Sequence, residues 1–121
     1  MKKTVLSILM GITLAGCYYD KADVINPNAA YITCDTTNVT YSGTIAPILS
    51  NNNCLGCHGS SAITQLDTYS AVKSAATSGK LLPAVNWSNT GNYIPMPSGG
   101  SKISDCNINK IAAWINQGEK N

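Results

Sequence analysis

The chain has 121 residues, which is enough for a single domain. Its eight lysines and six acidic residues give a formal net charge of only +2, and it contains no arginine. This weak charge argues against a surface that binds nucleic acid and against strong electrostatic steering of a partner.

The first residues are typical of an export signal. Lys2 and Lys3 precede an apolar run at residues 5–14, which is too short to cross a bilayer core of about 30 Å as a helix. The run ends in Leu14-Ala15-Gly16-Cys17, which resembles the lipobox of bacterial lipoproteins. That resemblance implies a signal peptide at residues 1–16, lipidation of Cys17, and an extracytoplasmic, membrane-anchored protein on the periplasmic side or at the outer membrane. The alternative is an ordinary secretory signal in which the cysteine has no role.

The mature chain is expected to be almost neutral, because removal of Lys2 and Lys3 leaves six lysines against six acidic residues. Residues 17–38 contain Pro27 and several asparagines and show no sustained hydrophobic period. We therefore predict a lipid-anchored tether at 17–38, followed by the domain proper at residues 39–121.

Three segments of the domain have helical periodicity. We predict helices over residues 44–53, 68–78 and 104–117, each with a capping Ser, Thr or Asp near its start. Their apolar faces are formed by Ile45, Ile48 and Leu49, by Tyr69, Val72 and Ala76, and by Ile108, Ile111, Ala112 and Ile115. Residues 81–100 are rich in Pro, Gly, Asn and Ser and predict a long loop, a type that is usually functional. No strand pattern competes, so the predicted fold class is all-α.

Cys54-Leu55-Gly56-Cys57-His58 is the attachment signature of c-type haem. Two thiols three residues apart on a helical turn can add to the two vinyl groups along one edge of the macrocycle, and the adjacent His58 then reaches the iron. A thioredoxin-like Cys-x-x-Cys would need a βαβ setting, which the pattern lacks. A zinc site could recruit only the distant Cys34 and Cys106, because His58 is the only histidine.

Met96 is the candidate for a second axial ligand. Met1 and Met10 leave with the signal peptide, and Met96 stands between Pro95 and Pro97 in the predicted loop. The two prolines limit backbone freedom, which suits a thioether that is presented to a metal. Lys80 and Lys102 are weaker alternatives as ligands, and a gap-filling core role is the alternative for Met96 itself.

Residues 44–118 resemble a class I-type c-type cytochrome domain of the kind found in bacterial lipoproteins. The matching segments are Ile45-Ala46-Pro47-Ile48-Leu49, Cys54-Leu55-Gly56-Cys57-His58-Gly59, residues 69–81, Pro95-Met96-Pro97 with Gly99-Gly100, and Ile111-Ala112-Ala113-Trp114-Ile115 with Gly118. The resemblance implies a small cytochrome c-like fold of three main helices around one covalent haem c. It also implies His58 as the proximal ligand, Met96 as the distal ligand, and Trp114 packed where the first and last helices cross.

Two cysteines remain once Cys17 is assigned to lipid and Cys54 and Cys57 to haem. In an oxidising compartment the remaining Cys34 and Cys106 are expected to form a disulfide, with two free buried thiols as the alternative.

Polar and aromatic side chains in the loop before Met96 are candidates for binding the haem propionates. They are Trp87 and Tyr93, with Asn86 and Asn92 beside them. Ordinary loop packing is the alternative for each.

Taken together, the motifs predict electron transfer by iron that cycles between Fe(II) and Fe(III), and no enzymatic activity. The expected partners are redox proteins that donate and accept electrons, with membrane contact through the lipid anchor and a monomeric state. One alternative is an enzyme or gas sensor with an open distal site, although the chain has no second histidine and no arginine to serve it. Another is a haem relay that docks on a larger respiratory enzyme.

Overall fold

The computed structural model describes residues 33–88 and 93–121. The predicted signal peptide, Cys17, Asn92 and most of the tether lie outside this part of the chain. Within it, no helix is both long and apolar enough to span a membrane.

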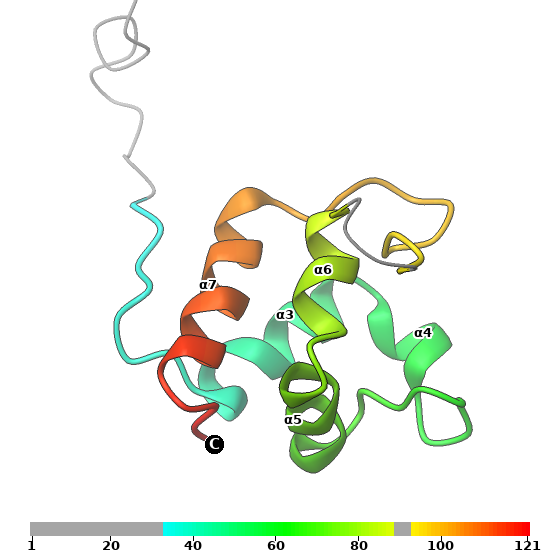
Figure 1. The fold of residues 1–121 in the computed structure, drawn as a ribbon, viewed down its shortest axis with the longest axis horizontal. Coiled ribbons are helices and arrows are strands. Elements are labelled where there is room, and N and C mark those ends of the chain that lie inside the picture. The colour runs from blue at the N-terminus through cyan, green and yellow to red at the C-terminus, as the bar shows by residue number, and fades with distance from the viewer. Residues whose placement is uncertain (1–32, 89–92) are drawn as a thin grey trace, which may run out of the picture. The chain divides into compact units, whose positions relative to one another are not determined.

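The described residues form helices and no strands, so the all-α prediction is confirmed for them (Figure 1). A single π-helical turn, η1, comes first, and five α-helices follow. Their bounds are η1 Tyr41–Ile45, α3 Ala46–Asn51, α4 Cys54–His58, α5 Tyr69–Thr77, α6 Leu81–Asn86 and α7 Asp105–Asn116.

The first helical segment begins earlier than predicted and is divided. The Thr40 hydroxyl accepts a hydrogen bond from the Gly43 amide at 3.1 Å, which starts η1 at Tyr41 rather than at residue 44. Pro47 falls in the first turn of α3, a position at which proline is tolerated. Asn53 has φ 55°, a left-handed conformation that breaks the helix and sets α4 apart from α3.

The second predicted helix is confirmed with nearly the predicted bounds. Thr68 caps α5 by accepting a hydrogen bond from the Ala71 amide at 3.3 Å. Val72 and Ala76 are buried one turn apart, as the periodicity predicts. Gly79 has φ 70° and ends the segment.

The prediction of a continuous loop over residues 81–100 is wrong in its first part. Residues 81–86 form the short helix α6, in which Leu81 and Val85 are buried on one face. Pro83 lies within the first turn, so it removes no intrahelical hydrogen bond. The apolar pair four residues apart therefore outweighs the helix-breaking composition of the segment.

The last helix, α7, begins after Ser104, whose hydroxyl accepts from the Asn107 amide at 3.3 Å. Its buried residues are Ile108, Ile111 and Trp114, whereas Ala112 and Ile115 are only partly buried. Trp114 is completely buried, and its ring centroid lies 6.4 Å from that of Tyr41 in η1. The first and last helical segments therefore meet at this aromatic pair.

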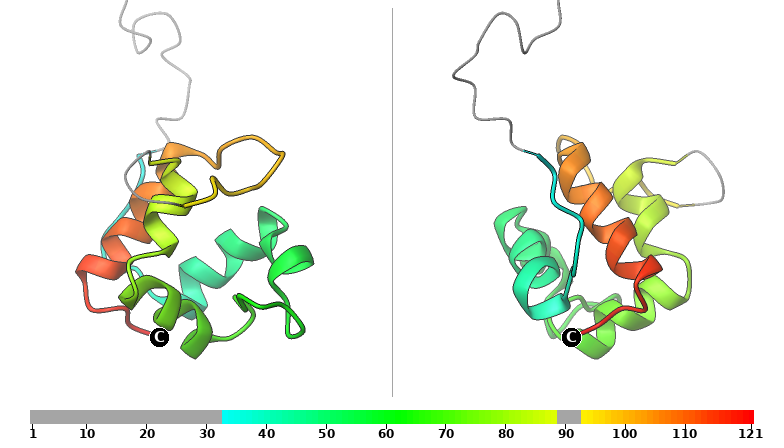
Figure 2. Two further views of the ribbon diagram at one scale, coloured as in Figure 1. Left: turned by 45° about the vertical axis from the view of Figure 1, so that its right-hand side comes forward. Right: turned by 90° about the vertical axis from the view of Figure 1, so that its left-hand side faces the viewer.

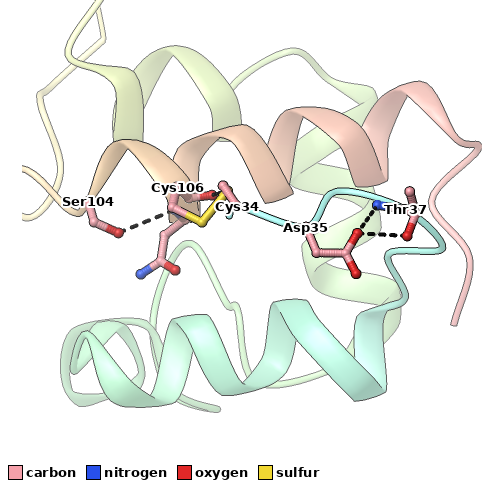
Figure 3. The surroundings of a disulfide bond; sticks show 6 residues. Cys34, Asp35, Thr37, Ser104 and Cys106 are labelled. Carbon is pink, nitrogen blue, oxygen red and sulfur yellow. Dashed lines mark hydrogen bonds between the residues drawn. A yellow bond between two sulfur atoms is a disulfide. The ribbon is translucent and has the colours of Figure 1, made fainter. Parts of the chain in front are cut away.

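The chain before η1 runs alongside α7 (Figure 3). Cys34 and Cys106 are joined by a disulfide, with their Cα atoms 5.4 Å apart. Further along, the Gln117 side chain donates to the Thr36 carbonyl at 2.8 Å and accepts from the Val39 amide at 3.0 Å. Residues 33–38, the end of the predicted tether, are thus attached to the last helix, and residues 33–121 form one compact unit.

Candidate functional site

The Cys-x-x-Cys-His motif forms a short helix on the surface. All five residues of α4 belong to the motif, and none of them is buried. Cys54 is partly buried and Cys57 is exposed, and the two are free thiols rather than a disulfide. A helix that buries no residue of its own gains little from packing against the rest of the chain. This is the situation expected of a segment whose packing partner is not part of the polypeptide.

The environment of Cys54 differs from that of a redox-active cysteine. Burial raises the pKa of the Cys54 thiol, and the neighbouring Cys57 raises it further, against a smaller lowering by a backbone hydrogen bond. Catalytic Cys-x-x-Cys motifs instead lower the pKa of one cysteine so that it is a thiolate at neutral pH. The environment of Cys54 raises the pKa of its thiol and so does not have the thiolate-stabilising character of those catalytic motifs.

The ring of His58 is fixed by the loop that follows α4. Its Nδ1 lies 2.8 Å from the Thr64 carbonyl oxygen, and the Leu66 amide donates to the His58 carbonyl, also at 2.8 Å. Because a carbonyl oxygen can only accept, the proton belongs on Nδ1 and the lone pair on Nε2 is available to a metal. Such a backbone partner is the usual means by which a ligating histidine is oriented.

Met96 is held by its main chain. Its amide donates to the Ala84 carbonyl at 2.9 Å, and its carbonyl accepts from the Trp87 indole Nε1 at 2.8 Å. The side chain is partly buried. Of the two alternative ligands, Lys80 is exposed at the start of α6, and Lys102 lies 3.5 Å from Asp105 in an exposed ion pair.

Helix α4 and the loop of residues 93–103, which contains Met96, lie on the same side of the domain. Both segments are on the right-hand side in Figure 1 and in the left view of Figure 2. Three of the large apolar side chains that stay exposed in the described residues belong to these two segments, namely Leu55, Tyr93 and Ile94, while Ile63 lies in the loop after α4 and Trp87 directly follows α6. Exposed apolar groups concentrated beside candidate ligands indicate a binding surface for an apolar group.

These residues fit a covalently attached haem better than a bare metal ion. Two free thiols, an imidazole with an available Nε2 and a thioether are the donors that c-type haem requires. Zinc would need further ligands, but Cys34 and Cys106 are bonded to each other. Among the described residues, no three His, Cys, Asp or Glu side chains come together as a metal site.

Some of the other groups at the site could be predicted from the sequence and others could not. The carbonyls of Thr64 and Ala84 could not have been identified, since every residue carries that group. Trp87 was a candidate for the propionates, and its one donor is engaged by Met96. Tyr93 and Asn86 are exposed, and their predicted role at the propionates stays a prediction.

No family model matches the chain, and comparisons with curated proteins and with solved structures give no match either.

Proposed function

We propose that this protein is a monohaem c-type cytochrome that carries electrons. The observation that carries the proposal is α4: two free thiols and His58 share one surface helix without buried residues, and the Nδ1 of His58 is held by Thr64. When bound, haem c supplies an iron that gains and loses one electron between Fe(II) and Fe(III).

The attachment chemistry needs only what α4 offers. Each thiol would add its S–H across one vinyl C=C: the S–H bond and the C=C π bond break, an S–C and a C–H bond form, and no oxidant is consumed. Reduced thiols that are not paired with each other are the required starting state. Cys54 and Cys57 are free.

Met96 favours a carrier over an enzyme or sensor. A thioether stabilises the reduced iron relative to a more basic nitrogen ligand, and an occupied distal position leaves no place for peroxide or a gas. Catalysis at an open position would also need acid–base groups, and the sequence holds one histidine and no arginine. The Met96 amide is bound to Ala84 in α6 and its carbonyl to Trp87 directly after α6, and this fixed backbone supports a role as a ligand.

The helical arrangement supports a cytochrome c-like fold as part of the proposal. The first and last helical segments meet at Tyr41 and Trp114, His58 follows the first segment, and Met96 precedes α7. With the predicted lipobox, we propose a monomeric, membrane-anchored protein outside the cytoplasm that exchanges electrons with other redox proteins.

Covalent attachment tests the proposal directly. The protein should be expressed in a host that matures c-type cytochromes, denatured, and examined for haem by mass spectrometry and haem staining. We expect the haem to stay on the chain, and Cys54→Ser with Cys57→Ser to abolish attachment. The matched control is Cys34→Ser with Cys106→Ser, which removes the other two described cysteines and should retain haem. Haem that is extracted from the unmutated protein by acidified solvent would refute the proposal.

A further inference from the structure

We infer that Trp87 is a positioning residue that holds the backbone of Met96 against the end of α6. The inference rests on the proposed function, because it concerns the ligand that Met96 supplies. Two hydrogen bonds define the contact, from the Met96 amide to Ala84 at 2.9 Å and from the Trp87 indole to the Met96 carbonyl at 2.8 Å.

The neighbouring prolines limit the ways in which the backbone around Met96 can be held. Pro95 and Pro97 have no backbone N–H, so Met96 supplies the only backbone donor of the three residues. That donor goes to Ala84, whose carbonyl is one of the four at the end of a helix that lack an α-helical partner. The indole of Trp87 then donates to the carbonyl of the same residue, so both polar backbone groups of Met96 are held at the C-terminal end of α6, one by Ala84 and one by Trp87.

Trp87 has an unusual backbone conformation for its type. It has φ 56° and ψ 38°, and the amide of Ser88 reaches back to the Pro83 carbonyl at 3.0 Å to close α6. The left-handed residue that closes a helix in this way is usually glycine, because a side chain is crowded there. Trp87 as a whole residue is also 38% exposed, so burial alone does not account for a tryptophan at this position. The hydrogen bond to Met96 accounts for a tryptophan at this position, because the left-handed turn directs the chain so that the indole N–H meets the Met96 carbonyl.

Trp87→Phe tests the inference, since it keeps an aromatic ring and removes the N–H. The matched control is Trp114→Phe, which removes an indole bond of the same 2.8 Å length, to the Lys120 carbonyl. Both variants are made in the matured, haem-carrying protein. The first measurement is the affinity of the ferric protein for added imidazole, which must displace Met96 to bind. The second is the hydrogen exchange rate of the Met96 amide.

We expect Trp87→Phe to raise the imidazole affinity and the Met96 exchange rate about five-fold, the factor that corresponds to one net hydrogen bond. Trp87→Gly, which suits the left-handed backbone but lacks the indole, should have the same effect. Trp114→Phe should lower the melting temperature and leave both measurements unchanged. The inference is overturned if the Trp87 variants match the parent, or if Trp114→Phe changes both measurements equally. Absence of covalent haem in the parent would instead refute the proposed function.

Discussion

Met96 and His58 are held by different kinds of contact. The His58 ring is oriented directly through Nδ1, whereas the contacts to Met96 act on its backbone and leave the thioether to the side chain's own rotamers. In the proposed function, Met96 can therefore be replaced without disturbing the attachment of haem to α4. Its substitution is expected to change ligand binding at the iron while the haem stays on the chain.

Met96→Ala should open the iron to carbon monoxide. The alanine cannot coordinate, so the ferrous variant should bind carbon monoxide readily and the reduction potential should fall, because the thioether that favours Fe(II) is gone. Carbon monoxide titration and potentiometry measure the two effects. Lys80→Ala and Lys102→Ala, at the alternative ligands, should behave as the parent does. Ready binding of carbon monoxide by the unmutated protein at neutral pH would move the sensor or enzyme alternative ahead.

Tyr41 should make stability depend on alkaline pH. Burial raises the pKa of its hydroxyl, and the negative charge of Asp67 raises it further. The folded protein thus holds this proton more tightly than the unfolded chain, so the contribution is complete below pH about 10, the ordinary tyrosine value, and is lost as the pH rises through the folded pKa. Tyr41→Phe should lessen the fall in unfolding free energy above that pH, measured by urea denaturation. Asp67→Asn should give an intermediate fall, and a Tyr41→Phe profile identical to the parent's would contradict this account.

At the scale of elements, the end of the chain ties three helical segments together. The Tyr69 hydroxyl of α5 donates to the Glu119 carbonyl at 2.8 Å, and the Trp114 indole of α7 donates to the Lys120 carbonyl. The same Lys120 carbonyl accepts from the Tyr41 amide of η1 at 2.8 Å. The backbone carbonyls of residues 119 and 120 therefore connect η1, α5 and α7 through hydrogen bonds, one of which is made by the buried Trp114.

Tyr69→Phe should destabilise the fold by about 1 kcal/mol, since it removes one partly buried hydrogen bond and leaves the ring in place. The change is measured as a lower midpoint of urea denaturation with an unchanged slope. Tyr93→Phe is the matched control, because that ring is exposed and its substitution should stay within about 0.5 kcal/mol of the parent. Equal effects of the two substitutions would show that the contact with Glu119 contributes nothing.

The sequence predicted elements best where periodicity and caps agree. For α5 and α7, Thr68 and Ser104 are the caps and the predicted bounds are nearly right. It failed for α6, where two apolar residues outweigh Pro83, and at Asn53, whose left-handed conformation divides the first helix. A six-residue helix has too few turns for a period to be visible, so tertiary packing decides it.

The candidate site was predictable to the extent that side chains define it. Cys54, Cys57, His58 and Met96 are candidates from residue type and spacing, and their roles stay a prediction, whereas the contacts that hold them could not be predicted. The acceptor for His58 and the acceptor for the Met96 amide are backbone carbonyls, which depend on the path of the chain. Only the Trp87 indole had a visible signal, and its partner could not be known before the loop was placed.

At the scale of the whole molecule, the disulfide connects the start of the described chain to the start of α7. Cys34 and Cys106 are 72 residues apart, and a closed loop of that length restricts the unfolded chain by about 4 kcal/mol in the entropic model. Cys34→Ser with Cys106→Ser should therefore lower the unfolding free energy by up to about that amount. Thermal denaturation measures the change, and the haem should remain attached. Both thiols alkylating freely in the unreduced native protein would contradict the bridge.

The predicted lipid anchor depends on Cys17, which lies outside the described residues.

Cys17→Ser should release the protein from the membrane without changing the domain. Lipidation supplies the only membrane affinity that the proposal assigns to the mature chain, so the variant should appear in the soluble extracytoplasmic fraction and lack the mass of acyl chains. The parent should begin at Cys17 and need detergent for extraction. The proposal gives the tether no role at α4 or Met96, so the visible spectrum of the released variant should equal that of the parent. If the variant instead fractionates with membranes and has the same mass shift, Cys17 is not the lipidated residue, and the first residues act as an ordinary secretory signal.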